Sequence, residues 1–128
     1  MKFGYTIIYV PDVEKTMAFY AQAFQLQIGF LHESKQYGEL DTGSTKLAFV
    51  AEALSESNGI QFSKNRLGQI AAGFEIALTS DNVQESYTKA CEAGAVAVHE
   101  PSVKPWGQTI AYVRDINGVL IEICSPMA

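Results

Sequence analysis

Residues 5–24 read YTIIYVPDVEKTMAFYAQAF, and residues 75–94 read EIALTSDNVQESYTKACEAG. Each stretch begins with a strand-like run and continues as an amphipathic helix, because its apolar residues recur at helical spacing. The helical stripe returns 70 positions later, as Val83, Tyr87, Ala90 and Cys91 after Val13, Met17, Tyr20 and Ala21. Asp12 and Asn82 precede the two helices and are the expected N-caps. The chain therefore carries an internal duplication.

The second part of each half repeats as well, at an offset of 74. Residues 38–49 alternate around Gly43-Ser44, and residues 112–123 alternate around Asn117-Gly118, a strong hairpin signal. The change of offset predicts four extra residues in the second half, within 100–107. Each half is then a βαβββ repeat, and the chain an α+β protein.

A sheet with one helix covers only one of its faces, so the other face needs a partner. We expect the two curved mixed sheets to surround a pocket, with the helices outside. One domain over 1–128 is predicted, with a first repeat over about 1–55, a linker over about 52–69 and a second repeat over about 70–128.

Charge and composition limit the classes of partner. The net charge is −5 and no run of Lys or Arg occurs, which argues against nucleic acid or an anionic membrane surface. No apolar run approaches the ~20 residues that cross a bilayer. The strand-like start also leads us to expect no secretory signal. We expect a cytoplasmic protein whose partners are a small molecule and a second copy of itself.

Three segments in this order resemble the vicinal oxygen chelate superfamily, which includes glyoxalase I, extradiol dioxygenases and bleomycin-resistance proteins. They are 10–20, where Val-Pro-Asp-Val leads to Phe-Tyr, then Lys104–Gln108, and then 111–123. The glyoxalase-like and bleomycin-resistance-type members are the most similar. The resemblance implies ligand positions on the first and last strands of each half, which fall on Tyr5, Ala48, Glu75 and Glu122.

These four residues are a poor set of metal ligands. Ala48 has no donor atom, and Tyr5 stands where the family often has His, which leaves Glu75 and Glu122 as the only candidate metal ligands. A catalytic ion usually keeps about three protein ligands and an open position. We therefore expect no metal and no other cofactor; the alternative is a weakly held divalent ion.

Glu122 lies between Ile121 and Ile123, so its side chain occupies the opposite face of the strand. If the isoleucines face the helix, Glu122 faces the pocket, and the same argument applies to Glu75. Two carboxylates in one cavity repel, which raises one pKa and leaves one acid and one base. Glu75 and Glu122 are thus the candidate catalytic residues.

Further candidates for ligand contact lie outside the strands. Trp106 either stacks on a planar ligand at the pocket mouth or packs in the core. The linker either covers the pocket, with Phe62 and Arg66 reaching a ligand, or is a solvated connection. His32 and His99 have no ligating residue at the proper spacing and are expected to be surface or strand histidines.

Two functions follow, and a third is kept open. The chain binds a drug or metabolite in a metal-free pocket, as a homodimer, with swapped and unswapped forms both allowed. Alternatively it is a lyase, isomerase or dioxygenase-like enzyme that uses Glu75 and Glu122 with a weakly held metal, or as a bare acid–base pair. The third reading is a relative that only dimerises.

Overall fold

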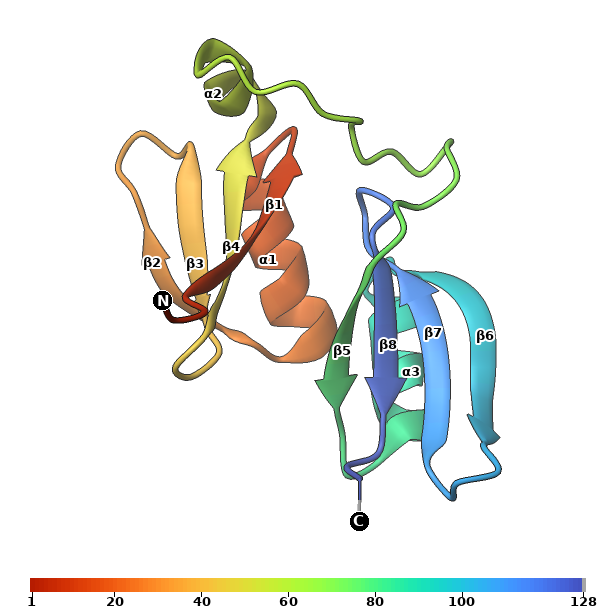
Figure 1. Cartoon of the computed structure of the whole chain (residues 1–128). Helices are drawn as coiled ribbons and strands as arrows, with labels where there is room; N and C mark the ends of the chain where they lie inside the picture. The colour runs from red at the N-terminus through yellow and green to blue at the C-terminus, as the bar shows by residue number, and fades with distance from the viewer. Residues whose placement is uncertain (128) are drawn as a thin grey trace. The chain divides into compact units, whose positions relative to one another are not determined.

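Two units with the same topology make up the computed structural model, which describes residues 1–127 (Figure 1). The first unit spans Met1–Lys64, and the second begins at Asn65. The predicted duplication and the α+β class are confirmed, because each unit holds one four-stranded mixed sheet with the same strand order.

The first unit follows the order predicted for a βαβββ repeat. Its sheet has the order β1-β4-β3-β2, in which β1 runs parallel to β4 and the other neighbours are antiparallel. Its elements are β1 (Tyr5–Val10), α1 (Val13–Phe24), β2 (Gln27–Leu31), β3 (Tyr37–Asp41), β4 (Lys46–Ala51) and α2 (Glu52–Ser57).

The second unit repeats this arrangement. Its sheet has the order β5-β8-β7-β6, and β5 again runs parallel to β8. Its elements are β5 (Glu75–Thr79), α3 (Val83–Glu92), β6 (Val96–Val103), β7 (Thr109–Arg114) and β8 (Leu120–Cys124). The first strands of the two units start 70 residues apart and the last strands 74 apart, as the sequence predicted.

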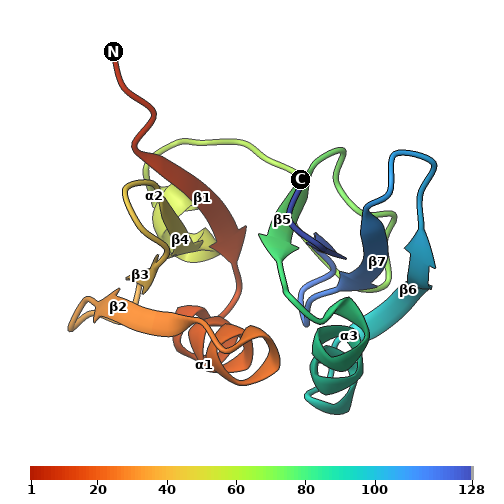
Figure 2. The ribbon, with the colours of Figure 1, turned by 90° about the horizontal axis from the view of Figure 1, so that it is seen from below.

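The two long helices begin where the capping residues predict. The Asp12 carboxylate accepts a hydrogen bond from the Lys15 amide at 2.9 Å, and the Asn82 side chain accepts one from the Glu85 amide at 3.1 Å. Each bond satisfies one of the amides that a helix start leaves unpaired. Both helices then lie against one face of their own sheet (Figure 2).

The other face of each sheet carries no helix, and we call it the open face. On β8, Ile121 and Ile123 are buried on the helix side, whereas Glu122 points to the open face and is half-buried. The predicted orientation of Glu122 is therefore found. Within residues 1–127, no helix is both long enough and apolar enough to span a membrane.

The extra length of the second repeat falls partly within a strand. Strand β6 has eight residues where β2 has five, and its pairing with β7 shifts register between Ala97 and His99 and again between His99 and Ser102. Such irregularities insert unpaired residues and bend a strand. Part of the predicted loop at 100–107 is thus strand.

The linker is not a loop throughout. Its first residues form α2, in which Glu52 and Ser55 are buried. At its other end the Arg114 guanidinium donates hydrogen bonds to three linker carbonyls, those of Arg66, Leu67 and Gln69, at 3.1, 3.1 and 2.8 Å. Arg114 therefore fixes the last part of the linker to the second unit.

Candidate functional site

A tyrosine and a carboxylate meet on the open face of the second unit. Tyr112 on β7 lies directly opposite Glu122 on β8 in the antiparallel register. The Tyr112 hydroxyl donates a hydrogen bond to Glu122 Oε1 at 3.0 Å. This contact orients the Glu122 carboxylate. It was not predicted from the sequence, because the alternating pattern assigned Tyr112 only to a hairpin.

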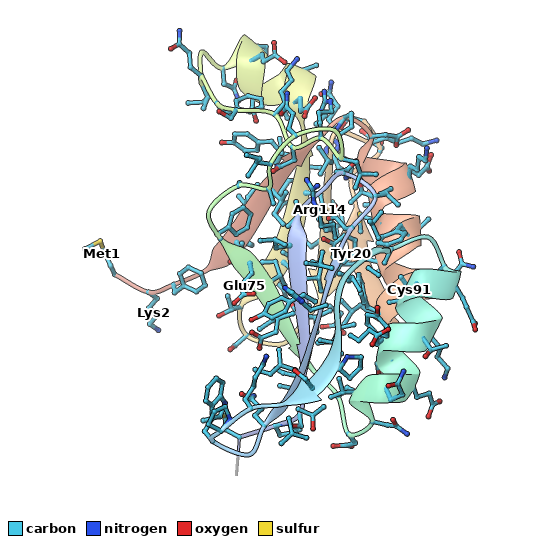
Figure 3. All side chains as sticks on the ribbon, turned by 90° about the vertical axis from the view of Figure 1, so that its right-hand side faces the viewer. Met1, Lys2, Tyr20, Glu75, Cys91 and Arg114 are labelled. Atoms are coloured by element: carbon cyan, nitrogen blue, oxygen red, sulfur yellow. The ribbon has the colours of Figure 1, made fainter. Side chains whose placement is uncertain are left out.

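Glu75 on β5 joins this pair. It is exposed and lies on the side of the sheet away from α3, the helix that carries Cys91 (Figure 3). Partial loss of solvent around its carboxyl raises the pKa of Glu75, and the charge of Glu122 and a hydrogen bond to it raise this pKa further. A hydrogen bond between two carboxyl groups requires a proton on one of them. We call Glu75, Glu122 and Tyr112 the acid cluster.

The neighbouring hydroxyl of Tyr112 and thiol of Cys124 keep their protons at neutral pH and act as hydrogen-bond donors. Burial, together with the hydrogen bond to Glu122 and its charge, raises the pKa of Tyr112 to about 12. The same causes raise the pKa of Cys124 to about 11. Cys124 is buried and its Sγ contacts the carbonyl of Leu78 at 3.8 Å. A thiol that keeps its proton is a weak nucleophile, so Cys124 has a structural role here.

His99 on β6 extends the same row of side chains. It pairs with Tyr112 across the β6–β7 register, and the two rings meet edge to face with centroids 6.2 Å apart. The expectation of a strand histidine is met, but its position next to the acid cluster was not foreseen. The register shifts on both sides of His99 explain this, since simple alternation does not place a residue within them.

The equivalent positions of the first unit are Tyr5 and Ala48. Tyr5 on β1 is 53% exposed, whereas Ala48 on β4 is fully buried and lies between Ile7 and Glu39 in the register. Ala48 thus contributes a small side chain to the sheet and no accessible surface. The register neighbour of Ala48 on β3 is Glu39, whose carboxylate accepts a hydrogen bond from the Tyr37 hydroxyl at 2.6 Å.

These side chains do not fit the catalytic metal ion that the resemblance to metal-dependent members of the superfamily implies. The acid cluster supplies two carboxylates, and among residues 1–127 no group of three or more His, Cys, Asp or Glu side chains comes together in a way that would hold an ion. About three protein ligands are usual for a catalytic site. The acid cluster therefore does not fit a catalytic metal ion.

The three remaining candidates have local partners. Trp106 is 61% exposed in the β6–β7 connection, and its ring N–H donates to Gln108 Oε1 at 2.9 Å. Phe62 packs edge to face on Tyr9, with ring centroids 4.7 Å apart. Arg66 is half-buried and donates to the carbonyl of Asn65 at 2.8 Å.

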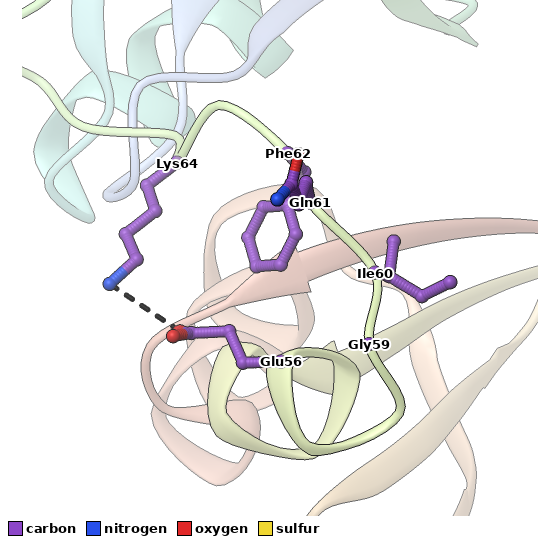
Figure 4. A pocket seen from close by; sticks show the side chains of 6 residues that line it. All are labelled: Glu56, Gly59, Ile60, Gln61, Phe62 and Lys64. Carbon is purple, nitrogen blue, oxygen red and sulfur yellow. Dashed lines mark ion pairs between the residues drawn. The ribbon is translucent and has the colours of Figure 1, made fainter.

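A cavity of about 400 Å³ lies beside α2 in the first unit, in the size range of small-molecule sites (Figure 4). An ion pair of 3.4 Å joins Lys64 to Glu56 at its edge, and both side chains are about half exposed. Sequence reasoning placed only Phe62 of its lining in a binding role. The lining residues are Glu56, Gly59, Ile60, Gln61, Phe62 and Lys64.

Comparisons with known proteins agree with this architecture. A family model described as a glyoxalase-like domain matches residues 3–128. The uncharacterized protein YraH of Bacillus subtilis is 28% identical over 116 residues, which cover 89% of this chain and 90% of that protein.

Solved structures show the same fold. A glyoxalase-related enzyme from Fulvimarina pelagi has a TM-score of 0.82 at 18% identity, over 98% of this chain and 88% of that one. A glyoxalase/bleomycin resistance protein/dioxygenase family enzyme from Burkholderia phytofirmans has a TM-score of 0.78 at 23% identity, over 98% of each chain.

Proposed function

Because the chain belongs to the glyoxalase-like domain family, within the vicinal oxygen chelate superfamily, we propose that it binds a small drug or metabolite without a metal ion. The observation that carries the proposal is the acid cluster. Glu75, Glu122 and Tyr112 present hydrogen-bonding groups on a sheet face that no helix covers, and they are too few in number to hold a catalytic ion.

The chemistry of the cluster defines what a ligand must offer. Glu122 already accepts one hydrogen bond from Tyr112, which fixes the direction of its carboxylate. The remaining lone pairs of the carboxylate oxygens accept hydrogen bonds from a ligand. A ligand with a hydrogen-bond donor group therefore fits this site better than a purely apolar one.

The test begins with protein treated with a chelator and dialysed. Thermal-shift measurements against bleomycin, aromatic acids and glutathione conjugates identify a ligand, because a ligand at 100 times its Kd adds about 2.7 kcal/mol to the free energy of unfolding. We expect Glu122→Gln to raise the Kd of that ligand about tenfold or more, because the variant loses a hydrogen bond to a charged group. Metal analysis accompanies each sample.

The matched control is Glu85→Gln, which removes a carboxylate from α3, where Glu85 pairs with Lys89 at 2.9 Å. It should leave ligand affinity unchanged. A stoichiometric divalent ion that survives dialysis and is required for binding would contradict the metal-free proposal.

The same cluster supports a second function, acid–base catalysis without a metal. An acid with a raised pKa beside a carboxylate base suits proton transfer next to a carbonyl group. Glu122→Gln distinguishes the two functions once a ligand is known. A variant that keeps ligand affinity but loses turnover supports the enzyme; an absence of turnover in the wild type supports binding alone.

A further inference from the structure

A second cluster of chemistry-bearing side chains lies on the open face of the first unit, and neither the family positions nor the acid cluster includes it. Its centre is Glu39 on β3, whose carboxylate accepts the hydrogen bond from Tyr37 two residues earlier on the same strand. Phe30 on β2 is the direct cross-strand neighbour of Glu39, and Ala48 is its neighbour on β4.

Aromatic rings surround this carboxylate on two sides. The rings of Phe30 and Tyr37 have centroids 6.4 Å apart and are tilted by 52°. Phe30 is 48% exposed and Tyr37 is half-buried, so both rings remain accessible on the open face. On the other side of Glu39 the register neighbour is the small Ala48. The next residue across the sheet, Ile7 on β1, is the first large side chain in that direction.

The Tyr37 hydroxyl is a permanent donor to Glu39. Burial, then the hydrogen bond to Glu39 and its charge, raise the pKa of Tyr37 well above its ordinary value. Tyr37 therefore orients Glu39 without neutralising it. The basic residue on β2, β3 and β4 is Lys46, and it pairs with Asp41 at 3.3 Å. Together these three charged groups leave the face with an excess of one negative charge.

We propose that Glu39, Tyr37 and Phe30 form a binding site for an organic ammonium cation. A carboxylate supplies the countercharge, and ring faces attract a cation through their quadrupoles when it lies within about 6 Å of a ring centroid. The methyl or methylene groups of such a cation pack on Phe30. An inorganic divalent ion is a poorer occupant, because it needs several oxygen ligands and the cluster offers one carboxylate.

This site goes beyond the proposed function, since it lies in the other unit and uses none of the residues of the acid cluster. The two are separable by experiment for the same reason. If the ammonium cation does not bind, the proposal of a ligand at Glu75 and Glu122 still stands. If no ligand binds at Glu75 and Glu122, the proposal of the ammonium site still stands.

The test uses the full chain labelled with ¹⁵N and titrated with choline, with amide chemical shifts as the readout. We expect saturable shifts at Phe30, Tyr37 and Glu39. The neutral tert-butyl analogue of choline, in which carbon replaces the nitrogen, should cause no saturable shifts at the same concentrations, because it lacks the charge that the site recognises.

Variants then assign the roles. Glu39→Gln and Phe30→Leu should each weaken choline binding by about two- to fivefold, in line with the usual strength of exposed charge and cation–ring contacts. Glu14→Gln removes the same charge from α1, where Glu14 pairs with Lys35 at 3.5 Å, and Glu85→Gln removes it from α3 of the second unit, where Glu85 pairs with Lys89 at 2.9 Å. Both should bind choline as the wild type does.

Other results would overturn the proposal. Equal binding by the Glu39→Gln variant, in a protein whose thermal melt shows that it is folded, would remove Glu39 from any recognition role. Equal binding of the neutral analogue would show an apolar site instead of a cation site. Shifts confined to other residues would place the cation elsewhere on the chain.

Discussion

At the scale of single residues, the most informative groups are those whose surroundings change their chemistry. Glu75 is exposed, yet its pKa is raised by partial desolvation and by Glu122. Tyr112 and Tyr37 each donate a hydroxyl hydrogen bond to a glutamate on the open face of their own unit. Each unit thus contains a tyrosine–glutamate contact, but at different positions of the repeat. In the first unit both residues lie on β3, and in the second unit they lie on β7 and β8.

The raised pKa of Glu75 predicts a pH-dependent change in stability. A carboxyl whose folded pKa is raised contributes stability below its ordinary pKa, and this contribution is lost as the pH rises through the folded value. Glu75→Gln should therefore raise Tm by about 1–3 °C at pH 7.5, a modest gain because solvent screens an exposed pair. The gain should vanish near pH 4, where Glu75 keeps its proton. Calorimetry at both pH values checks this.

Glu85→Gln is the control of opposite sign. The hydrogen bond and charge of Lys89 lower the pKa of Glu85, so its contribution is present above its ordinary pKa and is lost as the pH falls. This variant should be slightly less stable than the wild type at pH 7.5. A Glu75→Gln variant that loses stability at pH 7.5 would show that repulsion within the carboxyl pair is absent.

At the scale of the elements, the turns of the two β-hairpins differ in their contacts. The turn at Gly43 faces open space, whereas the turn at Gly118 also contacts the linker. Gly43 and Gly118 both have positive φ, +94° and +96°, which only glycine adopts readily. A Cβ on Gly43 would meet nothing within 4 Å, whereas one on Gly118 would lie 2.6 Å from Arg114 and 2.7 Å from the Arg66 carbonyl oxygen. The turn at Gly118 is therefore where the linker is fixed.

This difference predicts unequal costs for the same substitution. Gly43→Ala should lower the free energy of unfolding by about 1 kcal/mol, the cost of the positive φ alone. Gly118→Ala should lower it by about 2–4 kcal/mol, because the new methyl group also displaces the linker backbone. Urea denaturation measures both. Equal losses in the two variants would mean that Arg114 does not hold the linker against this turn.

At the scale of the whole molecule, each unit exposes one face of its sheet. In the first unit Tyr5 and Ile7, on the edge strand β1, are large apolar side chains with about half of their surface exposed. Large exposed apolar patches mark interaction sites in many proteins. We propose that the chain forms a homodimer that covers this β1 edge of the first unit.

The proposal predicts a sedimenting species of twice the chain mass of 14.0 kDa at micromolar concentration. Ile7→Glu should shift this species toward the monomer, because it places a charge on the covered edge. Ile70→Glu is the matched control, since Ile70 is 99% exposed in the linker. A wild-type protein that stays monomeric at every concentration measured by analytical ultracentrifugation would contradict the dimer.

The sequence by itself determined the repeat, the two capped helices and the face on which Glu122 lies. These features depend on local periodicity and on capping chemistry, which a few neighbouring residues decide. The helix in the linker was missed because α2 is only six residues long, too short for a periodic signal.

Only the tertiary structure decided which side chains meet. Tyr112 meets Glu122, and Tyr37 and Phe30 gather around Glu39, because strand register and two shifts in β6 set cross-strand neighbours that no local pattern encodes. The pocket between the halves remains a prediction. The physical reason for the division is range: helix caps and alternation are local, whereas the partners of a side chain on a sheet are set by strands far apart in the chain.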